Sequence, residues 1–250
     1  MRWKIRNSFV LALLTMLVVA TGRAQDSAEP EEPNPGGAAA VLHRPSRERD
    51  FVLNIASDQK SLWTTPKQIR LEDADWLLPL GAFSAGLIAS DTSIEKRLPT
   101  STTLIQHSQS LSNYGVASLI GTTGTFYFWG RVTQNDHARE TGLLGGEALA
   151  NVLIDTSLLQ FATGRQRPLE GNRKGQFWHG GQSFPSDHAA AAWSIASVVA
   201  NEYPGPLTQL LAYGTASAVT AARVVGREHF ASDAVVGSAL GWWMGRQVYR

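Results

Sequence analysis

The chain of 250 residues contains no cysteine, which excludes disulfide bonds, zinc–thiolate sites, iron–sulfur clusters and thiol nucleophiles. Charged residues are also scarce: at 17% of the chain, they argue against a disordered polypeptide or a long solvated coiled coil. The 22 basic and 21 acidic side chains nearly cancel, so the net charge of +1 supplies no overall field to attract nucleic acid. The remaining composition, 43% hydrophobic, suffices for one sizeable folded core.

The first 24 residues have the pattern of a secretory signal peptide. Arg2, Lys4 and Arg6 precede an apolar run over 9–20, and small residues follow up to Ala24. As a helix this run spans about 18 Å, shorter than the ~30 Å hydrocarbon core of a membrane. Residues 1–24 are therefore predicted to be a cleaved signal peptide, the alternative being an uncleaved anchor. We expect an exported, periplasmic protein, either soluble or membrane-associated.

Residues 25–49 are predicted to be a flexible linker, because proline and glycine are interspersed there with acidic and then basic side chains. Residues 50–250 are predicted to form one all-α domain. Their apolar side chains recur at three- and four-residue spacing, and no alternating strand pattern stands out. Helices are expected over residues 50–60, 73–90, 103–114, 115–131, 137–162, 187–202, 206–225 and 232–249.

Three short stretches carry the residues suited to chemistry. They lie at 160–168 (QFATGRQRP), 184–188 (FPSDH) and 222–233 (ARVVGREHFASD). Their side chains include three arginines (Arg165, Arg167 and Arg223), two histidines (His188 and His229) and the carboxylate of Asp233. Arginine suits the bidentate capture of phosphate-like oxyanions and stays protonated at any relevant pH. The combination predicts a site for an oxyanion.

Spacing within the stretches suggests local roles. His229 and Asp233 are four residues apart, and Gly226 is typical of a helix end, so His229 is expected in a short connection between two helices. Asp233 would there hold one ring nitrogen of His229 and leave the other free to attack, although the pair also fits an ordinary capping contact. Ser186 is a candidate N-cap that places His188 in the first helical turn, where backbone N–H groups bind anions; a plain helix start with a surface histidine fits as well.

In order and separation, the three stretches resemble the signature of the type 2 phosphatidic acid phosphatase (PAP2) superfamily, which includes bacterial acid phosphatases and vanadium haloperoxidases. The resemblance covers about residues 143–248. It implies an all-α bundle and a metal-independent phosphatase that hydrolyses phosphate monoesters, lipid or soluble, without a cofactor. The residues that match the signature are Arg167, Pro168, Pro185, Ser186, His188, Arg223, His229 and Asp233.

The resemblance also implies a role for each matching position. His229 would attack phosphorus to form a phosphohistidine, Asp233 would orient its ring, and His188 would protonate the departing oxygen. The phosphoryl oxygens would be held by side chains or backbone donors of Gln160, Arg167, Ser186, Asp187 and Arg223.

The chain departs from the signature at three positions. Gln160 stands in place of lysine, Asp187 in place of glycine, and Ala222 in place of serine. We expect the Asp187 carboxylate to turn away from the anion site, since a negative charge there is unfavourable. Arg165 is a candidate cation to compensate for the missing lysine. Two alternatives remain: a haloperoxidase that holds vanadate in the same site, and a catalytically weakened membrane or binding protein of the same fold.

Overall fold

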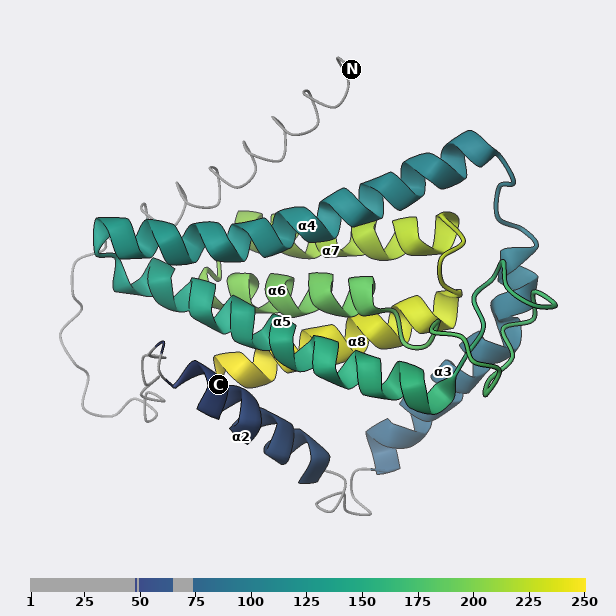
Figure 1. Cartoon of the computed structure of the whole chain (residues 1–250), viewed down its shortest axis with the longest axis horizontal. Coiled ribbons are helices and arrows are strands. Elements are labelled where there is room, and N and C mark those ends of the chain that lie inside the picture. The colour runs from purple at the N-terminus through teal and green to yellow at the C-terminus, as the bar shows by residue number, and fades with distance from the viewer. Residues whose placement is uncertain (1–47, 49, 65–73) are drawn as a thin grey trace.

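The computed structural model describes residues 48, 50–64 and 74–250, and all regular structure within them is helical (Figure 1). This confirms the predicted all-α class. The predicted signal peptide and nearly all of the predicted linker lie outside the described residues. The helices are α2 (Phe51–Thr64), α3 (Ala74–Glu95), α4 (Thr102–Thr133), α5 (Asp136–Thr163), α6 (Asp187–Glu202), α7 (Pro206–Val225) and α8 (Ala231–Tyr249).

Helix α6 forms the centre of the bundle. Most of its side chains are small, and nearly all residues from Ala189 to Ala200 are buried. Figure 1 shows α4 and α7 along one side of α6 and α8 along the other, with α5 crossing in front. One apolar cluster joins α4, α6 and α7, and a second joins α5, α6 and α8. Burial on every side explains why α6 lacks a polar face.

Glycines on α8 bring its backbone directly against α6. A Cβ on Gly237 would lie 2.4 Å from the carbonyl oxygen of Ser186, and one on Gly241 would lie 2.1 Å from that of Ala190. Only glycine permits this approach. The contact aligns the first turns of the two helices, and the backbone N–H of Ser186 donates to the carbonyl of Asp233 at 3.0 Å. Two of the three sequence stretches are thereby fixed to each other.

The prediction of two helices over 103–114 and 115–131 was wrong, because α4 runs unbroken through both ranges. Gly115, the first residue of the second expected range, lies inside this continuous helix and packs against α7. A Cβ at this position would lie 2.5 Å from the Cγ2 of Val219 on α7. The glycine therefore makes room for a neighbouring helix.

Helix α5 is, among the described residues, the one helix long and apolar enough to cross a membrane. Half of its most apolar window is buried inside the protein, as in a core helix of a globular bundle.

A row of polar side chains joins α2 to α5. None of the 14 residues of α2 is buried, and the helix is held by hydrogen bonds to α5. Asn54 donates to Glu147 at 3.3 Å, Gln59 donates to Asn151 at 3.1 Å, and Asn151 donates to Asp58 at 2.9 Å. Asp155 continues the row one turn further along α5. Its carboxylate is buried, and neither oxygen has a hydrogen-bond partner among the described residues.

Burial raises the pKa of Asp155 to about 6, although the nearby side chains of Gln59 and Trp63 oppose the rise. The folded protein thus binds the proton of the Asp155 carboxyl more tightly than the unfolded chain does, so stability is lost as the pH rises from about 4 to about 6.

Asp155→Asn should be more stable than the wild type at pH 7, with a free energy of unfolding higher by about 2 kcal/mol in urea denaturation. The difference should vanish below pH 4. Asp136→Asn, at an exposed carboxylate on the same helix, serves as the control. A difference for Asp155→Asn that is the same at both pH values would contradict the assignment.

Candidate active site

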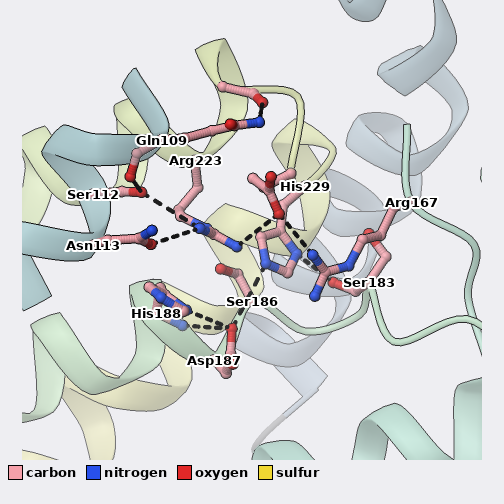
Figure 2. Close-up of polar contacts among 12 residues, drawn as sticks. Gln109, Ser112, Asn113, Arg167, Ser183, Ser186, Asp187, His188, Arg223 and His229 are labelled. Atoms are coloured by element: carbon pink, nitrogen blue, oxygen red, sulfur yellow. Dashed lines mark hydrogen bonds and ion pairs between the residues drawn. The ribbon is translucent and has the colours of Figure 1, made fainter. Parts of the chain in front are cut away.

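The three sequence stretches meet at one end of the bundle (Figure 2). The first stretch is the C-terminal end of α5 with the loop that follows, the second is the start of α6, and the third is the α7–α8 connection. In Figure 2, Arg223 and Arg167 flank His229, while Ser186, Asp187 and His188 lie on the side of α6. The structure therefore gathers the predicted oxyanion-binding and histidine residues in one place.

His229 is completely buried, and its ring is held in a defined orientation. Its Nδ1 lies 2.7 Å from the carbonyl oxygen of Ser183. A carbonyl oxygen only accepts hydrogen bonds, so Nδ1 must carry the proton. In the neutral ring, Nε2 then bears the lone pair, and it has no hydrogen-bond partner in the described part of the chain. This is the geometry of a nitrogen ready to act as a nucleophile.

The predicted contact between Asp233 and the ring of His229 was wrong. The oxygens of Asp233 accept instead from the hydroxyl of Ser183 at 2.6 Å, the backbone N–H of Phe230 at 2.8 Å and the guanidinium of Arg165 at 2.5 Å. Asp233 caps the start of α8 from the third helical position, as sequence spacing suggested in part. Its hydrogen-bonded link to His229 runs through Ser183, which bonds Asp233 with its hydroxyl and His229 with its carbonyl.

Arg165 does not compensate for the missing lysine. Its side chain is 1% exposed and forms ion pairs with Asp91 at 2.7 Å and with Asp233. The guanidinium carbon lies 4.8 Å and 4.6 Å from the ring centres of Phe177 and Phe230. With two carboxylates around it, its charge is cancelled inside the protein. Arg165 joins α3, the loop after α5 and α8.

Asp187 turns toward the site, contrary to the prediction. Its Oδ1 accepts from the backbone N–H of His188 at 2.8 Å, lies 3.0 Å from Nδ1 of the same residue, and lies 3.7 Å from Nε2 of His229. Burial acts to raise the pKa of Asp187, but hydrogen bonding to His188 and the charges of the two histidines hold it below its ordinary range. The bond to His188 explains the inward orientation. It leaves Nε2 of His188 available for proton exchange.

Two arginines of the stretches converge on one carboxylate. Arg167 Nη1 lies 2.6 Å and Arg223 Nη2 lies 3.3 Å from Oε2 of Glu228. Arg223 also contacts Ser112 and Asn113 of α4, each at 3.4 Å (Figure 2). Burial lowers the pKa of Arg223, and the neighbouring carboxylates oppose this; the side chain stays charged.

The remaining predicted residues support the loop before α6. Ser186 is the N-cap of α6, as predicted, and its hydroxyl accepts from the backbone N–H of Ala189 at 3.4 Å. Gln160 donates from Nε2 to the carbonyl of Pro185 at 2.9 Å. One amide hydrogen of Gln160 therefore holds the loop. Direct contact of either side chain with a ligand stays a prediction.

The family model of the PAP2 superfamily matches residues 139–250. Residues 139–250 are therefore similar to the PAP2 superfamily and are called the PAP2 region below. The chain is also similar to a lipid A 1-phosphatase of Porphyromonas gingivalis, at 29% identity over 139 residues, or 52% of this chain. The chain spans about a quarter of the length of that relative (27%). No solved structure matches the chain.

Elements outside the matched PAP2 region contribute to its site. Asp91 of α3 pairs with Arg165 and accepts from the backbone N–H of Ser232, while α4 supplies Ser112 and Asn113. Sequence analysis missed these residues, and no local pattern marks them. It also missed Ser183 and Glu228. Only the latter had a usable signal, since it is a carboxylate directly before His229 in the third stretch.

The candidate site combines a fixed histidine, a second histidine and two arginines. Such a set can position a phosphoryl group, attack it and exchange protons with it. Among the described residues, no group of three or more histidine, aspartate or glutamate side chains is arranged to hold a metal ion.

Proposed function

We propose that this chain is a phosphatase that hydrolyses phosphate monoesters through a phosphohistidine on His229, without a metal ion. The observation that carries the proposal is the buried ring of His229, whose Nδ1 is fixed by Ser183 while Nε2 has no partner among the described residues. A capping or packing histidine would use both nitrogens or face solvent. The adjacent arginines Arg167 and Arg223 are suited to stabilise the charge that develops on a transferring phosphoryl group.

The proposed reaction has two steps. Nε2 of His229 attacks phosphorus, the bond from phosphorus to the ester oxygen breaks, and His188 gives its proton to the departing alcohol. His188 then takes a proton from water, which attacks the phosphohistidine and releases inorganic phosphate and the free ring of His229. Asp187 supports the proton transfers by bonding Nδ1 of His188, which fixes the ring and leaves the other nitrogen to face the reaction.

Exposed aromatic side chains beside the site support a lipid-borne ester as substrate. Phe161, in the last turn of α5, is 91% exposed, and Trp178 is 81% exposed. Trp178 lies at the same end of α5, because its backbone N–H donates to the carbonyl of Thr163 at 2.7 Å. Trp178 adopts a left-handed backbone conformation with φ of 60°, which is unfavourable for a bulky residue. Large aromatic rings held in water suit contact with lipid.

The similarity of this chain to a lipid A 1-phosphatase supports the same conclusion. Both observations favour an ester whose phosphate is attached to a lipid over a small soluble ester.

The double variant Phe161→Ala/Trp178→Ala should lose at least about tenfold in kcat/KM toward a lipid phosphate in mixed micelles, because each ring buries apolar surface worth about 1–3 kcal/mol. Its turnover of a soluble nitrophenyl phosphate should be unchanged. Phe128→Ala, which removes an exposed ring near the opposite end of α5, is the matched control. Equal losses on both substrates would indicate a damaged site, and no loss on either would exclude a lipid contact at these rings. Failure of the wild type to release phosphate from any ester would refute the phosphatase.

A further inference from the structure

The arginines expected to bind the phosphoryl group already bind an anion. One oxygen, Oε2 of Glu228, lies 2.6 Å from Arg167 Nη1 and 3.3 Å from Arg223 Nη2. Arg167 comes from the first sequence stretch and Arg223 from the third, so the carboxylate joins two motifs that are separate in sequence. Charge-assisted hydrogen bonds of this kind are among the stronger ones in proteins.

The groups that an oxyanion would contact lie next to this carboxylate. Nε of Arg223 and Nε2 of His229 are both buried, and neither has a hydrogen-bond partner within the described residues. A phosphoryl group that contacted these two nitrogens would sit against the guanidinium edge that Glu228 uses. Its oxygens would need the same Nη donors, and its negative charge would lie beside a carboxylate. Both effects make Glu228 a competitor of the phosphoryl group.

Other charges near the site do not relieve this competition. Arg165 is neutralised by Asp91 and Asp233, and Gln160 carries no charge where the family has a lysine. Asp187 adds a further carboxylate 3.7 Å from Nε2 of His229. Binding of a phosphate group therefore depends on Arg167 and Arg223, the pair that Glu228 engages.

Glu228 is placed so that it can release these arginines. Its side chain is 25% exposed, and Arg167 is 32% exposed. The residue lies in the short connection between α7 and α8, so its carboxylate can rotate into water while the incoming anion takes its place beside the buried Arg223. The exchange of one anion for another thus needs only a side-chain rotation.

We propose that Glu228 is a specificity-determining residue that weakens the binding of every phosphoryl ligand by occupying the site between Arg167 and Arg223. Because the competition acts on the phosphoryl group alone, it raises the dissociation constants of all such ligands by a common factor. Inorganic phosphate and small esters then bind poorly, and an ester stays bound only if the rest of the molecule adds binding energy. The consequence for catalysis rests on the proposed function: the phosphate product leaves readily.

The test is a direct measurement of anion binding that needs no turnover. Isothermal titration calorimetry with inorganic phosphate and with orthovanadate compares the wild type with Glu228→Gln, which keeps the shape of the side chain and removes its charge. We expect Glu228→Gln to bind both anions at least about tenfold more tightly. Inhibition by the phosphate product should strengthen by the same factor if the chain is a phosphatase.

Glu170→Gln is the matched control, because Glu170 accepts from the backbone N–H of Arg167 at 2.8 Å and loses the same charge on substitution. Its anion affinity should match the wild type. Equal or weaker binding by folded Glu228→Gln would overturn the proposal and make Glu228 a residue that holds the arginines in place. Undetectable binding by both proteins would overturn it as well. Tighter binding by Glu228→Gln without hydrolysis of any ester would uphold it while refuting the phosphatase.

Discussion

Replacement of His229 by alanine should abolish phosphate release, with kcat/KM lower by about 10³-fold or more. The reason is that Nε2 is the proposed attacking atom and its ring is buried and fixed by Ser183. Brief incubation with a radiolabelled phosphate ester followed by alkaline quenching, which preserves the acid-labile bond between phosphorus and the histidine nitrogen, should leave label on the wild-type protein and none on His229→Ala.

His188→Ala distinguishes the two histidines. With a nitrophenyl ester, whose leaving group needs little protonation, the first step should proceed without His188 while the release of phosphate slows. Labelled protein should therefore persist in this variant. His179→Ala, which removes an exposed ring bonded through Nδ1 to the carbonyl of Phe177, should behave as the wild type. Label that remained on His229→Ala would show that another residue is the nucleophile.

Arg165→Met should lower the free energy of unfolding by about 3–5 kcal/mol, the cost of breaking a buried ion pair. The substitution keeps much of the volume of the side chain but leaves the buried carboxylates of Asp91 and Asp233 without their cation. Urea unfolding followed by circular dichroism measures the loss. Adding Asp91→Asn to Arg165→Met should restore part of it, because one of the two uncompensated charges is removed.

Arg167→Met is the contrasting variant. This arginine is 32% exposed, so its loss should change stability by about 1 kcal/mol or less while weakening the binding of phosphate. If instead Arg165→Met unfolded like the wild type and bound phosphate more weakly, Arg165 would be a ligand of the anion, as the sequence alone suggested.

Local signals explain where the sequence predicted the fold correctly. The expected ranges 187–202 and 206–225 coincide with α6 and α7, since Ser186 caps the first and Pro206 opens the second. The motif spacing likewise located His188, Arg167, Arg223 and His229, because their positions are tied to helix ends that the sequence marks. The residues suited to catalysis thus lie close to positions where a helix begins or ends.

Local sequence patterns could not predict which side chains the charged groups contact. Arg165 and Arg167 are two residues apart and equally basic, yet one is buried between two carboxylates and the other reaches Glu228. Asp187 faces inward because His188 and His229 lie within reach of its carboxylate. Such choices depend on residues far away in sequence, which only the assembled bundle brings together.

The contact of Asp91 with Ser232 has a consequence for how the chain folds. The two residues are separated by 141 positions, and Arg165 lies between them in sequence and beside them in space. Loops of this length close late and slow the search for the native state. During synthesis, Arg165 leaves the ribosome before one of its two carboxylates does. The cluster of Arg165, Asp91 and Asp233 is therefore complete only after α8 has been made. A nascent chain that lacks this helix cannot present an assembled site.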